Sequence, residues 1–183
     1  QTGNNIYPAD TATNPNLNVG IGTTTPAGIF HVKGAAPNIY LESTTINGPD
    51  LFFGGSGTFD GRQYILYSSG SGNTIGAGKF AIHDETGGAA RIVIDSTGNV
   101  GIGTTTPRTR LELGNDGAIL ATGTYGSGWT EPNLGTGTRL LWYPRKAAFR
   151  AGYVNGTQWN DANIGGYSVA IGYNTKATGD NST

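Results

Sequence analysis

Short alternating runs of apolar residues dominate the pattern of this chain. They are rich in β-branched and aromatic residues and are bounded by Gly, Asn, Asp or Ser, which is typical of β-strands. The runs lie at 29–32, 38–42, 50–53, 63–67, 79–82 and 91–95. Helical periodicity is hard to find, because Gly or Pro interrupts almost every window before two turns could form. The pattern predicts an all-β protein with hairpin loops at 84–88 and 95–99, the second with Gly98 at a positive φ.

Nine residues, Asn-Val-Gly-Ile-Gly-Thr-Thr-Thr-Pro, occur twice, at 18–26 and at 99–107. In each copy Val and Ile point to one face of a strand, and the glycines leave the other face bare for the approach of another backbone. The proline lacks the N–H that a central strand needs, so the chain turns there and restarts as a second strand. We call each copy a connector. Its apolar residues are Val19 and Ile21 in the first, and Val100 and Ile102 in the second.

A third periodic region closes the chain. Ser168 and Ser182 lie fourteen residues apart, and Val169 and Ile171 alternate with small residues between them. Repeats of this length are typical of the stacked turns of a β-roll or β-solenoid, whose coils bury a face only against their neighbours.

The apolar pairs are scattered among glycines, so one chain has little with which to build a single core. Isolated hairpins and coils are marginal in water unless another layer covers their apolar face. Three identical chains around an axis would bring each Val-x-Ile pair against its symmetry mates, and would also hide the sheet edges. The sequence therefore predicts an elongated homotrimeric fibre with short β-hairpins and connectors, leading into a β-roll at the C-terminus.

Composition narrows the range of partners. The 183 residues include 32 Gly and no Cys or Met, with 13% charged residues and a net charge of −1. This balance gives no basic stripe for nucleic acid, and the lack of Cys excludes disulfides and thiolate metal sites.

No run approaches the roughly 18 apolar residues of a membrane helix, so we expect no membrane insertion. A start at Gln1 without Met indicates a processed or excised piece, such as one that has lost a secretory signal peptide.

The connectors and the C-terminal region resemble known fibre proteins. Gly-Asn-Val-Gly-Ile-Gly-Thr-Thr-Thr-Pro at 98–107, followed by Arg-Leu-Glu-Leu at 110–113, resembles a recurrent unit of phage tail-fibre shafts and of large secreted bacterial surface proteins. The stretch 165–182 is similar to the head repeats of trimeric autotransporter adhesins. That resemblance implies a trimeric left-handed β-roll in which Val169 and Ile171 face the axis.

Candidate catalytic and metal-binding chemistry is sparse. The glycine-rich run at 70–80 has the wrong spacing for a phosphate loop, and Phe80 stands where Ser or Thr would hold magnesium. A ring of His83 or Asp84 from three chains could hold a metal ion, but a solvated turn is the simpler explanation of both residues. The acids are scattered singly apart from Asp84-Glu85, and no nucleophile elbow occurs. We therefore expect no enzyme activity, no cofactor and no metal.

The most distinctive surface candidate is the basic and aromatic segment at 139–152. Aromatic faces that stack on sugars, beside arginines that pair with anions, would suit anionic glycans or surface polymers. The alternative is an interchain seam, with Leu140 and Trp142 buried at the axis and arginines bonding the carbonyls of the neighbouring chain. Trp159 lies in a Gly- and Asn-rich loop and could be a sugar platform or a packing residue. The candidate contact residues are Arg139, Trp142, Tyr143, Arg145, Lys146 and Trp159.

These patterns predict a structural and adhesive segment of an extracellular, cell-surface fibre. Its partners would be two further copies of itself and cell-surface glycans. A phage tail fibre on a virion surface is the alternative, and a polysaccharide-degrading fibre is a more remote one. The predicted segments are a first connector region, a hairpin region, a second connector, an aromatic and basic segment and the start of the β-roll. They span 1–34, 35–98, 99–118, 119–160 and 161–183.

Overall fold

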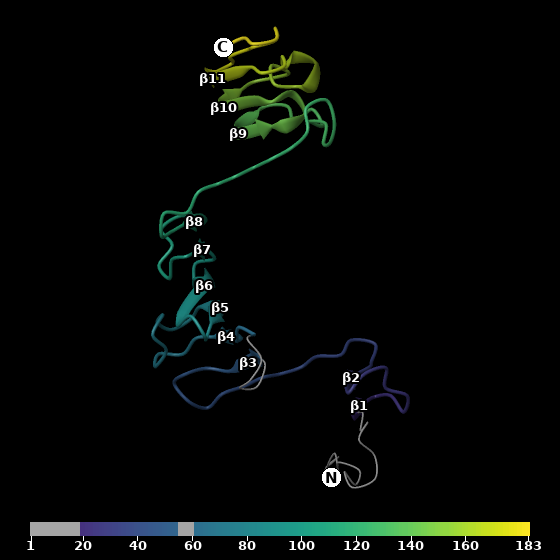
Figure 1. Cartoon of the computed structure of the whole chain (residues 1–183), viewed down its shortest axis with the longest axis vertical. Coiled ribbons are helices and arrows are strands. Elements are labelled where there is room, and N and C mark those ends of the chain that lie inside the picture. The colour runs from purple at the N-terminus through teal and green to yellow at the C-terminus, as the bar shows by residue number, and fades with distance from the viewer. Residues whose placement is uncertain (1–18, 55–60) are drawn as a thin grey trace. The chain divides into compact units, whose positions relative to one another are not determined.

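The computed structural model describes residues 19–54 and 61–183, and the part of the first connector region before Val19 lies outside them. Over the described residues the regular structure is β-strand apart from two short 3-10 turns, which confirms the all-β prediction. The chain divides into two compact units, Gln1–Gly117 and Ala118–Thr183 (Figure 1). We call these the N-terminal unit and the C-terminal unit and describe each by itself.

The N-terminal unit contains two sheets. The first pairs β1 (Val19–Ile21) with β2 (Phe30–Val32) in parallel. The second has six strands in chain order, antiparallel except for the last, parallel pair (Figure 1). These strands are β3 (Asp50–Phe53), β4 (Tyr64–Ser68), β5 (Phe80–Asp84), β6 (Ala89–Ile94), β7 (Val100–Ile102) and β8 (Leu111–Leu113).

One predicted strand is wrong. Residues 38–42 form no strand, although five other runs lie on strands close to their predicted bounds. Ile39 and Tyr40 are exposed in an extended segment. A strand needs a hydrogen-bonding neighbour as well as a suitable composition, and this segment has none among the described residues.

The hairpin between β6 and β7 shows how local sequence fixes the register. Gly98 has a φ of +81°, as predicted. Asp95 Oδ1 accepts hydrogen bonds from the backbone N–H of Thr97 at 2.8 Å and of Asn99 at 2.9 Å, and also from the Thr97 hydroxyl. These bonds, chiefly that from the hydroxyl, lower the pKa of Asp95 to about 2. Asp95 is therefore ionised at neutral pH, and its carboxylate stabilises the turn.

The core of the six-stranded sheet lies on one face only. Tyr67, Ala81 and Val93 are buried side by side on adjacent strands, and Ile75 packs against them from the loop before β5. Buried Asp84 is held by Arg62 at 3.0 Å and by Arg91 at 2.5 Å. The hydrogen bond from Arg91 is the main reason why the pKa of Asp84 is lowered.

The C-terminal unit is a three-stranded sheet folded over a small core. Tyr143, Ala148 and Ile164 are buried together beneath the sheet. The strand β10 lies in the middle, antiparallel to β9 and parallel to β11. The elements are β9 (Gly137–Tyr143), the turn η1 (Pro144–Lys146), β10 (Ala148–Val154), the turn η2 (Asp161–Asn163) and β11 (Val169–Tyr173).

Candidate functional site

The two connectors share the same pairing of their two strands and the same backbone bonds between them. Val19 pairs with Phe30 in the first, and Val100 pairs with Leu111 in the second, both in parallel strands. The following backbone bonds also correspond, since the N–H of Lys33 donates to Ile21 at 2.8 Å and that of Gly114 donates to Ile102 at 2.8 Å. In each connector the chain therefore leaves the first strand, turns at the Thr-Thr-Thr-Pro segment and continues as a second strand parallel to the first. The proline predicted this turn.

The bare glycine face is filled by the connector's own turn. A Cβ at Gly20 would stand 2.4 Å from the carbonyl oxygen of Thr23, and one at Gly101 would stand 2.5 Å from that of Thr104. Both distances are far below any real carbon–oxygen contact. The predicted close approach of a backbone is present, but the backbone is that of the Thr-Thr-Thr segment and belongs to the same chain.

The six-stranded sheet carries a row of aliphatic side chains on the face opposite its core. One residue from each strand stands directly beside the next across the whole sheet, and all six are half-buried or exposed. The row consists of Leu51, Leu66, Ile82, Ile92, Ile102 and Leu113. Val100 stands on the same face, in a second row with Ile94 and Leu111. Both connector residues Val100 and Ile102 thus belong to one uncovered apolar surface.

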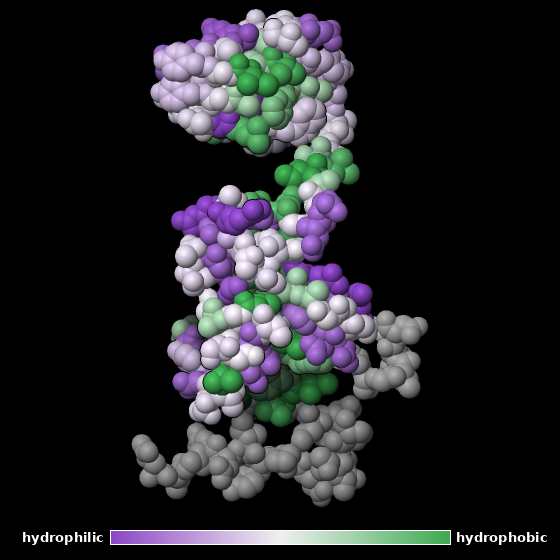
Figure 2. Space-filling model, turned by 90° about the vertical axis from the view of Figure 1, so that its left-hand side faces the viewer, coloured by the Kyte–Doolittle hydropathy of each residue, from purple (hydrophilic) through white to green (hydrophobic). Residues whose placement is uncertain are grey.

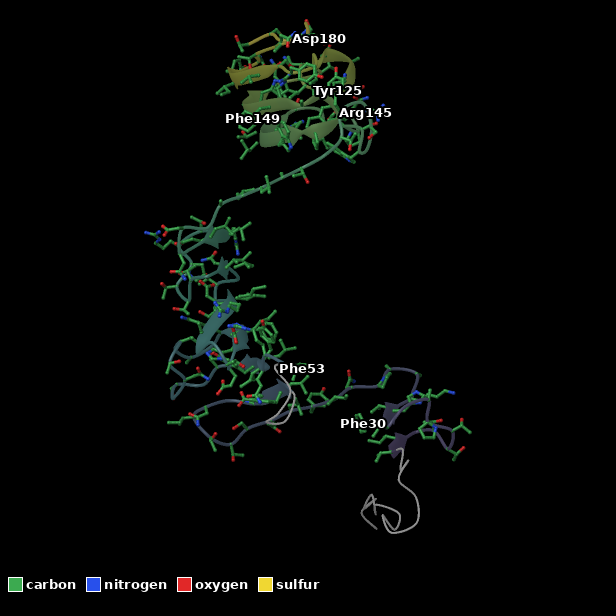
Figure 3. All side chains as sticks on the ribbon, viewed as in Figure 1. Phe30, Phe53, Tyr125, Arg145, Phe149 and Asp180 are labelled. Atoms are coloured by element: carbon green, nitrogen blue, oxygen red, sulfur yellow. The ribbon has the colours of Figure 1, made fainter. Side chains whose placement is uncertain are left out.

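The three-stranded sheet of the C-terminal unit also leaves one face uncovered, which we call the outer face. Trp142, Phe149 and Val169 form one row across it. Leu140, Ala151 and Ile171 form the next, and Ile171 remains 63% exposed. Figure 2 shows the hydrophobic residues of this unit gathered on one face. Phe149 points to that face, away from Tyr125 and Arg145 (Figure 3).

The outer face has a groove and an aromatic pair. The groove measures about 380 Å³ and is lined by Ile119, Ala121, Leu140, Trp142 and Phe149. The rings of Tyr153 and Tyr173 stack in parallel, with centroids 5.5 Å apart. A surface of this kind, apolar and almost free of charge, is suited to packing against another protein surface.

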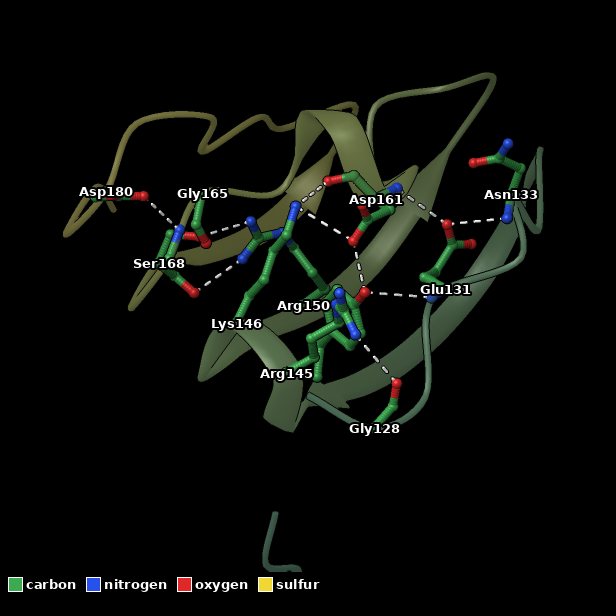
Figure 4. A network of polar contacts seen from close by, with 12 residues as sticks. Gly128, Glu131, Asn133, Arg145, Lys146, Arg150, Asp161, Gly165, Ser168 and Asp180 are labelled. Atoms are coloured by element: carbon green, nitrogen blue, oxygen red, sulfur yellow. Dashed lines mark hydrogen bonds and ion pairs between the residues drawn. The ribbon is translucent and has the colours of Figure 1, made fainter. Parts of the chain in front are cut away.

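Beneath the sheet, a buried arginine holds the coil together. Arg150 is fully buried and donates to the Ser168 carbonyl at 2.9 Å, the Ser168 hydroxyl at 2.8 Å and the Ala177 carbonyl at 3.0 Å. Burial lowers the pKa of Arg150, since no carboxylate compensates its charge. The guanidinium therefore ties β10 to the segments on either side of β11 (Figure 4).

The fourteen-residue periodicity is visible in the hydrogen bonds. The Ser168 hydroxyl donates to the Gly165 carbonyl, and the Ser182 hydroxyl donates to the Gly179 carbonyl, each at 2.6 Å. The N–H of Val169 donates to the Ser182 carbonyl at 2.9 Å, so the two copies lie against each other. This is the geometry of successive coils of a roll.

The basic side chains of the segment 139–152 form hydrogen bonds within the chain. Arg139 donates to the Gly135 carbonyl at 2.5 Å, and Arg145 donates to the Gly128 carbonyl at 3.3 Å. Lys146 lies 3.2 Å from Asp161 Oδ1 and also donates to the Asp161 carbonyl. Figure 4 shows the bonds of Arg145 and Lys146.

The burial of Tyr143 and Trp159 corrects the prediction that these two residues make contacts outside their own chain. Tyr143 is fully buried, and its hydroxyl donates to Asp161 Oδ1 at 2.5 Å, which is the main reason why the pKa of Asp161 is lowered. Trp159 is 1% exposed, and its Nε1 donates to the Thr175 carbonyl at 3.0 Å. Neither ring offers a face to a sugar on this chain, and Trp159 has the packing role. Trp142 remains exposed, on the outer face.

The residues considered for metal binding point elsewhere. Asp84 is occupied by its two arginines, and His83 Nδ1 lies 3.4 Å from Glu85 Oε2. Across the described ranges, no group of three or more His, Cys, Asp or Glu residues is arranged to hold a metal ion.

Comparison with known proteins identifies one region. Residues 164–183 match the YadA head domain repeat, in two copies. The match confirms the resemblance of the C-terminal stretch to adhesin head repeats and coincides with the repeated hydrogen bonds from a serine hydroxyl to a glycine carbonyl. A comparison with curated proteins finds no match. In the parts of the chain that the structure describes, no helix is long and apolar enough to cross a bilayer.

Proposed function

We propose that this chain is a structural and adhesive segment of an extracellular surface fibre made of three copies of the chain. The observation that carries the proposal is the uncovered apolar face in each unit. In the N-terminal unit it is the aliphatic row across six strands, and in the C-terminal unit it is the outer face. Apolar surfaces of this extent favour association over exposure to water.

In this proposal the connector residues and the first strand of the roll form the contacts between chains. Each of these side chains stands on an apolar face rather than in the core of its own unit. Ile21, Ile102, Val169 and Ile171 are exposed, while Val19 and Val100 are half-buried. The proposal of three chains rests on the match to the head repeat, because the adhesins that contain this repeat are trimeric.

The proposed role at a cell surface is to extend a stalk and to present binding surfaces for glycans or other surface polymers. Threefold repetition would raise the avidity of a weak contact site. The role requires no catalysis, and the polar groups described above are used for internal hydrogen bonding. The head-repeat match favours a cell-surface adhesin over a phage tail fibre.

The proposal is tested by the mass of the purified chain in solution, from light scattering during size-exclusion chromatography, together with low-resolution imaging. We expect a mass of three chains and a slender particle. A folded monomer or a compact globule would exclude the trimeric fibre.

A further inference from the structure

The loop at 123–136 carries exposed aromatic side chains on a rigid backbone. Trp129 is 53% exposed and Tyr125 is 50% exposed. The loop otherwise consists mostly of Gly, Thr, Ser and Asn with a single acid, Glu131. Tyr, Trp, Ser, Gly and Asn are the residues on which antibody binding loops rely, because the rings supply contact area at low entropic cost and the small polar residues supply hydrogen bonds. We call this segment the aromatic loop.

Buried polar groups hold the aromatic loop in one conformation. Glu131 is buried, and its carboxylate accepts the N–H groups of Asn133 at 3.0 Å, Leu134 at 2.7 Å and Asp161 at 3.2 Å. On the other side of Trp129, the N–H of Gly126 donates to the Arg145 carbonyl at 2.8 Å. The loop is thus pinned on both sides of its tryptophan (Figure 4), which reduces the entropy that binding would cost.

The exposed rings are also fixed by aromatic neighbours. Trp129 meets Tyr143 edge to face, with centroids 5.6 Å apart and planes at 83°. Tyr125 stacks on Tyr167, with centroids 4.6 Å apart and planes at 7°. Each pair uses one contact of the exposed ring and leaves the remaining surface of that ring to solvent. Arg145 bonds the part of the loop between Tyr125 and Trp129, because its carbonyl accepts from the Gly126 N–H and its guanidinium donates to the Gly128 carbonyl.

The aromatic loop does not lie on the outer face. Trp129 packs on Tyr143, and the adjacent strand residue Trp142 points to the opposite side of the sheet, because side chains alternate along a strand. Packing of chains through the outer face therefore accounts for Trp142 but leaves Trp129 exposed.

We propose that the aromatic loop, with Tyr167, is a carbohydrate-binding site for neutral polysaccharides. Pyranose rings have an apolar C–H face that suits an exposed indole or phenol ring, and hydroxyls that suit the surrounding amides and carbonyls. The charged groups around the loop are two cations and three acids, and all of them form hydrogen bonds or ion pairs within the chain. They are Arg145, Lys146, Glu131, Asp161 and Asp180. The surface therefore favours an uncharged ligand over an anionic one. This inference rests on the adhesive role proposed above and names its ligand class.

The test uses the full 183-residue chain. Binding to dextran, mannan, galactan and xyloglucan is measured by affinity electrophoresis and calorimetry, with heparin as the anionic comparison. We expect binding to at least one neutral polymer in preference to heparin. Trp129→Ala should weaken that binding by roughly tenfold or more, as expected for an aromatic hot spot. Leu120→Ala, which removes an exposed aliphatic side chain outside the aromatic loop, should change it little.

The mass in solution is measured for each variant. Unchanged binding in Trp129→Ala, or no binding of any neutral polymer by the natural chain, would overturn the proposal. A changed oligomeric mass in Trp129→Ala would also overturn it, because the loop would then be a contact between chains. The loop is complete within one chain, so binding by a monomer would refute the trimeric fibre and leave the carbohydrate site standing.

Discussion

His31 and Glu112 occupy equivalent positions in the strands that follow the two connectors, and they accept the same backbone hydrogen bond. The N–H of Ala27 donates to His31 Nδ1 at 3.1 Å, and the N–H of Arg108 donates to Glu112 Oε2 at 2.7 Å. Both donors directly follow the connector proline. The nine identical residues are thus completed by a side chain whose chemistry differs between the copies.

This difference allows the two bonds to be tested separately. In Glu112→Ala the Arg108 N–H loses its acceptor, so amide exchange monitored by NMR should show loss of protection at Arg108 and not at Ala27. The pKa of Glu112 is lowered, chiefly by its hydrogen bond with Arg108, so in the natural chain this carboxylate remains an acceptor below the ordinary range of a glutamate. In His31→Ala the loss of protection should fall on Ala27 instead, and equal behaviour of the two amides in both variants would refute the prediction.

Gly101→Ala should destabilise the six-stranded sheet. The new methyl group would stand 2.5 Å from the Thr104 carbonyl oxygen, which belongs to backbone that cannot yield without breaking the connector turn. A cost of roughly 1–3 kcal/mol is expected from such overpacking. Urea unfolding followed by circular dichroism measures it. Gly61→Ala is the matched control, because no described residue lies within 4 Å of a Cβ at that position. A similar loss in both variants would contradict the steric explanation.

Arg150→Met should weaken the C-terminal unit. The apolar stem is retained, but the carbonyls of Ser168 and Ala177 lose their donor in a buried site. Unsatisfied buried groups of this kind cost roughly 1–3 kcal/mol in the free energy of unfolding. The fluorescence of buried Trp159 is a suitable probe during urea unfolding. Arg139→Met removes a partly exposed arginine that bonds a single carbonyl, and it should cost clearly less.

Asp95 predicts an acid-dependent contribution to stability. Its folded pKa of about 2 lies below the ordinary value, so the turn stabilises the fold fully above about pH 4. That contribution is lost as the pH falls towards 2. Thermal unfolding of Asp95→Asn and the natural chain should differ most near neutral pH and converge near pH 2. A difference that is independent of pH would show that the charge of Asp95 is not involved.

Ile171→Asp should disrupt association without unfolding the chain. The side chain is 63% exposed on the outer face, so a carboxylate is tolerated in a single chain but is costly in an apolar contact between chains. The expected result is a lower mass by light scattering with an unchanged circular dichroism spectrum. Lys176→Asp alters an exposed residue beyond β11 and should leave the mass unchanged. Retention of the full mass by Ile171→Asp would remove the outer face from the proposed contacts.

Local sequence was sufficient to predict most strands and turns. The alternation in 50–53 and 63–67, and the Asp-to-Asn turn at 95–99, depend on neighbours close in the chain. The strand predicted at 38–42 is absent because strand formation there does not depend on local sequence alone. Its composition suits a strand, but a strand also depends on a partner that only the tertiary structure can supply.

The polar partners of the basic segment were beyond sequence reasoning. Lys146 meets Asp161, fifteen residues away, and Tyr143 meets the same carboxylate. Trp159 stands in a loop of small polar residues that looks exposed, yet it is buried through contacts with a later segment. The aromatic composition around Trp129 can be read from the sequence. The conformation of the loop depends on the hydrogen bonds of buried Glu131, which the sequence does not reveal.

Each connector completes its own hydrogen bonds between Val19 and Lys33 in the first copy, and between Val100 and Gly114 in the second. The copies are therefore interchangeable parts. A duplication or deletion of the 81 residues that separate equivalent positions would rejoin the chain inside an intact connector. The length of the protein could thus change during evolution by whole 81-residue repeats, and no new connector sequence would be needed.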